Sequence, residues 1–338
     1  MGLSDKSCDA WPDAIADEDA SLLWFDAKSS FLPKSHRKLL YQRTTGSSKR
    51  ITTGSTKIPA RMQLINSGDT KIAVSPEPST HADANRRMIS KKLNNKVAVI
   101  TGAARGIGSA IAKRFAAEGA VVVINYASRK QDAERTMAAI QAKGGVAITF
   151  QADITKASAV EQLFTAANER FGRIDILVNN AALDDFVPLN QITEEHFHSH
   201  FEVNVLGMLL AVKEAVKYLK KNNGCILNIS SLSSSHPAAG SAVYGGSKAA
   251  VDAITATLAL ELGPNGIRIN AINPGMVKTE GLDELSFITP EFRNQIAAMT
   301  PLGRLGEPED IAAAAVLFCS GDARWITGQC IRVSGGLI

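Results

Sequence analysis

The chain has 338 residues, of which 45% are hydrophobic, and this is enough for one large or two small domains with packed cores. Its formal net charge of +4 is small for this length, and no apolar run approaches the roughly 18 residues that a membrane span requires, so we expect no membrane span. The four cysteines lack the spacing of metal ligands, which argues against a disulfide framework or a metal site and favours a reducing compartment, the cytoplasm.

Charge is distributed unevenly only in the first 93 residues. Residues 1–26 are acidic, whereas residues 28–71 are basic and rich in Ser, Thr and Gly. This composition is typical of a largely disordered extension. A basic stretch of this kind can also bind a membrane surface or nucleic acid, or belong to a regulated, partner-binding part, but a solvated linker is the simpler interpretation. We therefore assign residues 1–93 to an N-terminal extension and expect no nucleic-acid partner.

From residue 94 onward, short β-branched runs alternate with longer, Ala-rich amphipathic segments. Strands that alternate with helices predict a parallel sheet with helices on both faces, because each crossover returns the chain to the same edge of the sheet. The fold class we expect for residues 94–338 is therefore a single α/β domain with a doubly wound, Rossmann-type parallel sheet. The predicted strands are Val97–Ile100, Val121–Ile124, Ala147–Gln151, Ile176–Val178, Ile226–Ile229, Ile267–Ile272 and Cys330–Val333. The predicted helices are Ile107–Glu118, Arg129–Ala142, Ser158–Arg170, Glu194–Lys220, Gly246–Leu262 and Glu309–Ser320.

A glycine-rich turn, T-G-A-A-R-G-I-G, joins the first predicted strand to the first predicted helix. Gly102 permits a tight turn, Gly106 lets the backbone approach a pyrophosphate, and Gly108 lets the helix pack close to the strand. The helix N-terminus adds free N–H groups for an anion. A glycine loop that binds nothing is the alternative, but the order of strand, turn and helix favours a dinucleotide site.

The end of the second strand indicates which dinucleotide is bound. An acid at this position accepts hydrogen bonds from the adenosine ribose and repels a 2′-phosphate, but the sequence here is N-Y-A-S-R-K, from Asn125 onward, without an acid. Arg105 in the glycine turn and Arg129 or Lys130 after the strand can pair with a phosphate. We therefore expect NADP as the cofactor and consider NAD less likely, although such cations can also be ordinary surface residues.

A Tyr-Lys pair with a spacing of four residues occurs twice, at Tyr126 and Lys130 and at Tyr244 and Lys248. The first pair follows a predicted strand end, whereas the second lies on a predicted helical turn and has Ser231 thirteen residues before its tyrosine. Delivery of a hydride to a carbonyl carbon requires a proton donor at the oxygen, and a phenol can serve. We expect the Lys248 ammonium, one turn away, to lower the pKa of the tyrosine.

Other interpretations of these residues remain open. Tyr244 can be a half-buried packing residue, and Ser231 lies in a serine-rich loop where a single serine is unremarkable. His236 in the same loop can line the pocket or be a surface histidine, and Asp184 and Asp185 are similarly ambiguous.

Several motifs in order give a wider resemblance. These are T-G-A-A-R-G-I-G, Asp153 after the third strand, N-N-A-A from Asn179, N-V-L-G from Asn204, N-I-S-S ending at Ser231, Y-G-G-S-K from Tyr244, P-G at Pro274 and I-T-G-Q-C-I-R-V-S-G-G near the end. Residues 94–338 thus resemble the single-domain short-chain dehydrogenase/reductases, and most closely the 3-oxoacyl-carrier-protein reductase-like members. Two departures, Ala182 in place of a glycine and Ser334 in place of an aspartate, do not touch the chemistry directly.

The resemblance implies a role for each matching residue. The catalytic set comprises Asn204, which keeps a water in the proton relay, Ser231, Tyr244 and Lys248. The cofactor-binding set is Gly102, Arg105, Gly106, Ile107, Gly108, Asn125, Arg129, Asp153, Ile154, Asn179, Ala181, Tyr244, Lys248, Pro274, Val277 and Thr279. Homodimers or homotetramers are common in this family.

These observations predict an NADP-dependent oxidoreductase that interconverts a secondary alcohol and a ketone and acts as a reductase. The alternative is a catalytically silent dinucleotide-binding sensor or scaffold of the same fold. The segment Val277 to Leu305 is long and rich in apolar side chains, and we expect it to form a mobile lid over a pocket for a small-molecule carbonyl or alcohol substrate with a hydrophobic body.

Overall fold

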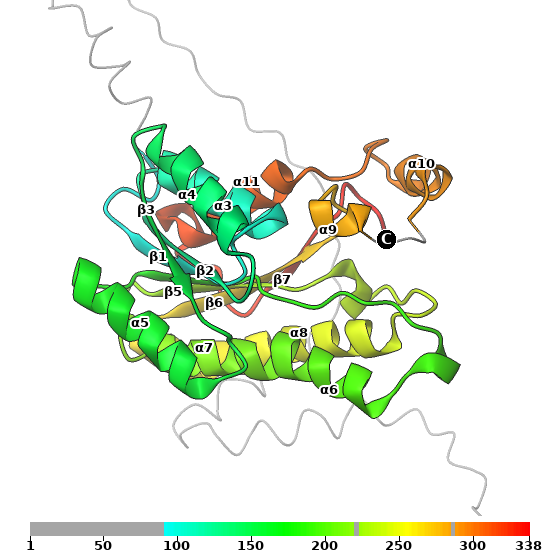
Figure 1. The fold of residues 1–338 in the computed structure, drawn as a ribbon, viewed down its shortest axis with the longest axis horizontal. Coiled ribbons are helices and arrows are strands. Elements are labelled where there is room, and N and C mark those ends of the chain that lie inside the picture. Colours follow the sequence, from blue (N-terminus) through cyan, green and yellow to red (C-terminus); the bar gives the residue numbers. More distant parts are fainter. Residues whose placement is uncertain (1–90, 220–222, 285–287) are drawn as a thin grey trace, which may run out of the picture. The chain divides into compact units, whose positions relative to one another are not determined.

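The computed structural model describes residues 91–219, 223–284 and 288–338 (Figure 1). In this part of the chain, seven strands form one parallel sheet in the order β3-β2-β1-β4-β5-β6-β7. The strands are β1 (Val97–Ile100), β2 (Val121–Tyr126), β3 (Val146–Gln151), β4 (Ile176–Asn179), β5 (Cys225–Ile229), β6 (Arg268–Pro274) and β7 (Cys330–Val333). The predicted doubly wound α/β sheet is confirmed. The predictions for the extension fall almost wholly on residues 1–90, which lie outside the described residues.

Helices cover both faces of the sheet (Figure 1). On one face lie α3 (Gly106–Ala117), α4 (Lys130–Gln141) and α11 (Pro308–Cys319), and on the other lie α5 (Ala157–Phe171), α7 (Met208–Ala215) and α8 (Ala242–Leu262). Strand β1 shows why helices cover both faces, because its side chains alternate between two cores. Ala98 and Ile100 pack in the core with α3 and α11, while Val99 packs in the core with α5 and α7, and all three are fully buried.

Two predicted helices differ from the observed ones near the predicted site. The predicted helix Glu194–Lys220 is divided into α6 (Glu194–Phe201), a π-helical turn over Glu202–Gly207, and α7. Helix α8 begins at Ala242 rather than at Gly246. A Cβ on Gly245 would lie 2.9 Å from the Ser233 carbonyl oxygen, so this glycine lets the first turn of α8 pack closely against the turn Leu232–Ser234.

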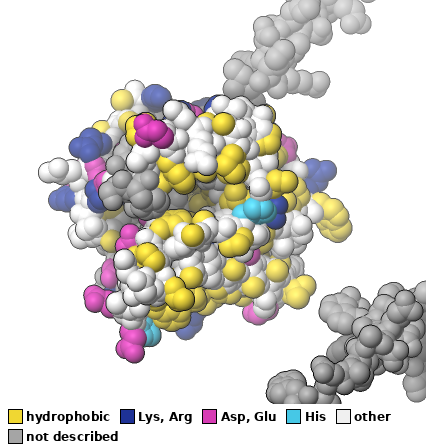
Figure 2. All heavy atoms as spheres, turned by 90° about the vertical axis from the view of Figure 1, so that its right-hand side faces the viewer, with side chains coloured by type: hydrophobic (Ala, Val, Ile, Leu, Met, Phe, Trp, Pro, Cys, Tyr) yellow, Lys and Arg dark blue, Asp and Glu magenta, His cyan; other side chains and the backbone are white. Residues whose placement is uncertain are grey.

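The strand order reverses between β1 and β4, because the chain builds β2 and β3 on one side and the remaining strands on the other. In open α/β sheets, a ligand crevice forms outside the carboxyl ends of the strands at this switch. Beyond these ends lie α9 (Glu280–Asp283) and α10 (Pro290–Met299), seen at the right of Figure 1. Figure 2 shows hydrophobic side chains gathered across this face of the molecule.

The segment after β6, from Val277 to Gly306, has its two ends side by side. Val277 and Gly306 form an isolated parallel bridge, so that α9 and α10 belong to an excursion between them. Ile288 is buried, whereas Met299 is 59% exposed. The excursion occupies the position expected of a lid, and its mobility stays a prediction.

Among the described residues, no helix is both long enough and apolar enough to cross a membrane.

Candidate active site

The glycine turn between β1 and α3 leaves no room for side chains. Gly102 has φ +60°, and a Cβ there would lie 2.7 Å from the Cα of Ala181. A Cβ on Gly108 would lie 2.5 Å from the Asn180 amide nitrogen and 2.7 Å from the Gly102 carbonyl oxygen. Gly106 also has a positive φ, +56°. The first and third glycines thus allow the close backbone packing that a dinucleotide turn requires.

The N-terminus of α3 offers its N–H groups without a cap of its own. Its N-cap residue, Arg105, forms no side-chain cap hydrogen bond, and the first turn, which contains Ile107, carries no acid. Nearby, the Asn179 Oδ1 atom is buried without a hydrogen-bond partner, while its Nδ2 donates to Asn228 at 2.9 Å. The helix N-terminus has no cap residue of its own, and an acid from another segment, Glu280, accepts from the Gly106 N–H. The unpartnered buried acceptor and this helix N-terminus fit a phosphate-bearing ligand with hydrogen-bond donors.

Other predicted cofactor residues have structural partners in this region. Asn125 accepts a hydrogen bond from the Gly102 N–H at 3.3 Å and donates to the Ala152 carbonyl at 2.9 Å, so it ties the end of β2 to the turn. The Asp153 carboxylate accepts from the Thr155 N–H at 2.9 Å. Ile154 is buried.

The segment after β6 lies next to the glycine turn. Pro274 is the last residue of β6, and Val277 is buried beside Gly306. Thr279 caps α9 by accepting from the Leu282 N–H at 3.1 Å, and its methyl group would lie 3.5 Å from a Cβ on Gly106. The structure therefore brings Thr279 to the start of α3.

Ser231, Tyr244 and Lys248 converge at the carboxyl end of β5. Ser231 follows this strand, and its side chain hydrogen-bonds the phenol of Tyr244, which lies in the first turn of α8. The Lys248 ammonium lies 5.9 Å from the centroid of the Tyr244 ring and donates to the Ile229 carbonyl at 2.9 Å. A phenol, a hydroxyl and a buried ammonium group thus lie together.

Burial shifts the pKa of both members of the Tyr-Lys pair. It raises the pKa of Tyr244 to about 12, against a smaller lowering by the Ser231 hydrogen bond. It also lowers the pKa of Lys248 to about 8. The pKa of Tyr244 is thus raised, because the phenol loses its surrounding water, and Lys248 is not among the causes of this shift. The expected lowering by the ammonium stays a prediction.

The other Tyr-Lys pair, Tyr126 and Lys130, does not have the arrangement of Tyr244 and Lys248. Tyr126 is the last residue of β2, whereas Lys130 is the first residue of α4, so the two do not share a helical turn. Lys130 instead lies 3.9 Å from Glu134.

Asn204 lies in the π-helical turn and joins three parts of the site. Its Oδ1 accepts from the Leu183 N–H at 2.8 Å, and its Nδ2 donates to the Leu183 carbonyl and to the Ser247 hydroxyl, both at 2.9 Å. The side chain is buried and holds the loop after β4 against α8. Its predicted part in a water relay stays a prediction, and π-helical turns are frequent at functional sites.

Asp184, left ambiguous by the sequence, lies close enough to influence the catalytic groups. Asp184 as a whole residue is exposed, but its carboxyl group has lost part of its surrounding water, and this raises the pKa of Asp184. The negative charge of Asp184 in turn raises the pKa values of both Tyr244 and Lys248. The adjacent Asp185 donates its backbone N–H to His200 at 3.2 Å, which anchors this loop.

Two acids that the sequence analysis did not identify contact the predicted phosphate-binding groups. Glu284 pairs with both Arg105 and Arg129, and Glu280 accepts a hydrogen bond from the Gly106 N–H at 3.0 Å. Nothing local in the sequence indicates these contacts, because the acids are more than 150 residues away along the chain.

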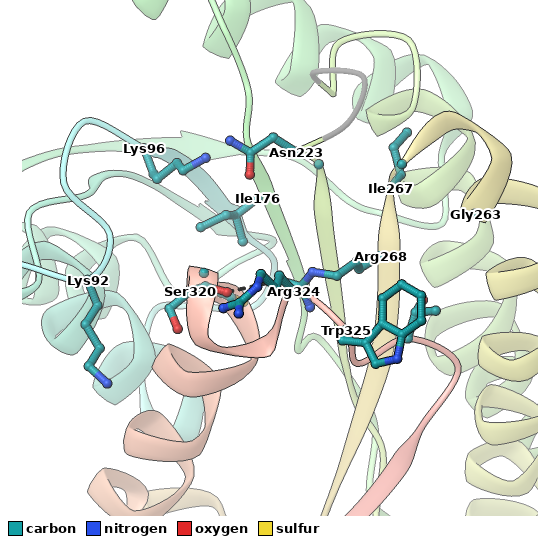
Figure 3. Close-up of a pocket in the computed structure, with 15 residues that line it drawn as sticks. Lys92, Lys96, Ile176, Asn223, Gly263, Ile267, Arg268, Ser320, Arg324 and Trp325 are labelled. Atoms are coloured by element: carbon teal, nitrogen blue, oxygen red, sulfur yellow. Dashed lines mark hydrogen bonds between the residues drawn. The ribbon is translucent and has the colours of Figure 1, made fainter.

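A basic cavity of about 430 Å³ lies at the opposite edge of the sheet, near the amino ends of the strands (Figure 3). Two of its cations have partners, since Lys92 pairs with Asp322 at 2.6 Å and Arg268 donates to the Phe318 carbonyl at 2.8 Å. None of the predicted catalytic residues lines this cavity, so it is separate from the candidate active site.

Comparison with known proteins identifies the relatives of this chain. The family model described as enoyl-(acyl carrier protein) reductase matches residues 102–338. An uncharacterized oxidoreductase of Methylorubrum extorquens is 48% identical over 73% of this chain and 99% of its own length, and 3beta-hydroxysteroid dehydrogenase 1 of Eggerthella lenta is 40% identical over 72% and 94%. A Burkholderia cenocepacia short chain dehydrogenase, solved in complex with NADP, superposes with a TM-score of 0.68 at 34% identity over 73% of this chain and 99% of its own.

Proposed function

The chain belongs to the short-chain dehydrogenase/reductase family, and we propose that it is an NADP-dependent reductase that converts a ketone to a secondary alcohol. The observation that carries this proposal is the convergence of Ser231, Tyr244 and Lys248 beside the crevice at the glycine turn. When bound, NADPH would supply a hydride to the carbonyl carbon. The side chains of this protein would supply the proton and hold the carbonyl oxygen.

We assign the proton donor as the phenol of Tyr244. With a pKa raised to about 12, the phenol is protonated at neutral pH, which is the form that reduction requires. Ser231 hydrogen-bonds the phenol and would hold the substrate oxygen against it. Once the phenol has lost its proton, the buried Lys248 ammonium would stabilise the phenolate. The phenol is therefore in the protonated form from which it would donate to the carbonyl oxygen.

The preference for NADP rests on two cations at the adenosine end. The end of β2 offers Asn125 rather than an acid, and Arg105 and Arg129 reach a common point, since both pair with the same carboxylate. Guanidinium groups bind phosphate well because their N–H groups match two oxygens at once. The residues that would hold the cofactor are Arg105, Arg129 and the N–H groups at the start of α3, among the predicted set.

The substrate class follows from the face around the catalytic groups. Apolar side chains gather at this face (Figure 2), and a Phe186 ring lies 5.4 Å from the Tyr244 ring. Relatives include proteins named as steroid and versicolorin reductases or dehydrogenases, whose names indicate substrates with large hydrophobic bodies. We therefore propose a small-molecule ketone with a hydrophobic body.

A substrate panel tests the proposal. Purified protein would be assayed with NADPH and with NADH against cyclic, aromatic and acyclic ketones, and kcat/KM compared. We expect turnover of at least one hydrophobic ketone and a higher kcat/KM with NADPH. Binding of NADPH without turnover of any ketone would instead support the silent sensor, and a preference for NADH would contradict our assignment of Arg105 and Arg129.

Assembly and location belong to the same proposal. We expect a homodimer or homotetramer in the cytoplasm, and light scattering of the purified protein with imaging of a tagged chain would test both expectations.

A further inference from the structure

Glu280 occupies the N-terminus of α3, where a pyrophosphate would bind. Its Oε2 accepts from the Gly106 N–H at 3.0 Å. Because α3 has no cap of its own and no acid in its first turn, this carboxylate from a distant segment is the anion that satisfies it. An incoming pyrophosphate and Glu280 therefore need the same donor.

Glu284 likewise occupies the donors of Arg105 and Arg129 that a 2′-phosphate would need. Its carboxylate forms a two-point pair with Arg105, in which Nη2 and Oε2 lie 2.9 Å apart. The Arg129 Nη2 atom lies 3.4 and 3.5 Å from the two carboxylate oxygens. A carboxylate held between two guanidinium groups occupies the same N–H donors that a phosphate at this point would need.

Glu284 and Arg105 are both ionised at neutral pH. The hydrogen bond from Arg105 lowers the pKa of Glu284, and the same bond raises the pKa of Arg105. Asp132 lies 3.8 Å from Arg129 as a second acid. A 2′-phosphate must therefore displace a carboxylate from both guanidinium groups rather than meet two unpaired cations.

The two acids differ in which cofactor they oppose. The N–H groups of α3 would bind the pyrophosphate that NADPH and NADH share, whereas the arginines would bind only the 2′-phosphate that distinguishes them. We propose that Glu284 is a specificity-determining residue that weakens the preference for NADP by competing with the 2′-phosphate, while Glu280 competes with both cofactors equally. This inference rests on the proposed cofactor site.

The expected size of the effect follows from the exposure of the pairs. The Glu284 and Arg129 side chains are each about half exposed, so we expect each ion pair to contribute only a small free energy. Two such pairs correspond to roughly a three- to tenfold change in affinity.

The test is a titration of the full-length protein with NADPH and with NADH at fixed ionic strength, with Kd read from cofactor fluorescence and without any turnover. We expect Glu284→Gln to lower the Kd for NADPH about three- to tenfold and to change the Kd for NADH less than about twofold. Glu280→Gln should lower both Kd values by the same factor. Glu291→Gln is the control, because it removes one charge from α10, in the same excursion, and should change neither.

Each outcome bears on one claim. If Glu284→Gln leaves the Kd for NADPH unchanged, or shifts both cofactors equally, the role of Glu284 is refuted. If the unaltered protein binds NADH more tightly than NADPH, the proposed cofactor is wrong, whatever the variants show. If Glu291→Gln matches Glu284→Gln, the effect comes from overall charge and the inference also fails.

Discussion

Gly108→Ala tests whether close packing of the glycine turn shapes the cofactor site. The new Cβ would lie 2.5 Å from the Asn180 amide nitrogen, 2.7 Å from the Gly102 carbonyl oxygen and 2.9 Å from the Ala103 Cα. Two of these atoms are backbone, so no rotamer change relieves the clash. Overpacking of this kind costs about 1–3 kcal/mol. For a domain of this size, each kcal/mol lowers Tm by about 2–4 °C, so we expect a fall of about 2–12 °C.

Thermal unfolding with and without NADPH measures this effect, and the stabilisation by NADPH should disappear in the variant. Gly246→Ala is the matched control. Gly246 is exposed within α8 and a Cβ there meets no atom within 4 Å, so the alanine should stabilise the helix by about 0.8–1 kcal/mol. A Gly108→Ala protein with unchanged Tm and unchanged response to NADPH would refute the packing argument.

Three further changes test the catalytic residues. Ser231→Ala should lower kcat about 10²–10³-fold with an unchanged Kd for NADPH, because it removes a positioned hydroxyl; steady-state rates with a fluorescence titration check this. Since burial lowers the pKa of Lys248 to about 8, the ammonium is present below that pH and lost above it, so kcat/KM for reduction should fall as pH rises beyond 8; a flat profile to pH 10 would exclude this role. Asn204→Leu leaves the Leu183 N–H unpaired and should cost about 1–3 kcal/mol, measured by denaturant unfolding.

Features governed by local patterns could be predicted from the sequence. The strands are short apolar runs, and the turn at Gly102 and Gly108 carries its glycines at fixed spacing. Ser231, Tyr244 and Lys248 were chosen from their spacing together with their place after the fifth predicted strand and the family motifs. The structure brings them together because the turn Leu232–Ser234, which follows β5, packs against α8.

Features that depend on tertiary contact could not be predicted. The pKa of Tyr244 depends on burial, which the residues beside it do not reveal. Glu284 and Arg105 are 179 residues apart in the sequence, so no local pattern predicts their contact. The π-helical turn at Asn204 lies inside a continuous helical pattern, and it is the hydrogen bonds of Asn204 to Leu183 and Ser247 that distinguish it.

The most direct test of the central claim compares two tyrosines that carry the same local motif. Tyr244→Phe removes the proposed proton donor, and Tyr126→Phe removes the hydroxyl of the other Tyr-Lys pair, Tyr126 and Lys130, at the end of β2. With NADPH and a ketone substrate, we predict that kcat falls by at least about 10²–10⁴-fold in Tyr244→Phe, with an unchanged Kd for NADPH, and stays normal in Tyr126→Phe. A Tyr244→Phe protein that turns over at the normal rate would contradict the account.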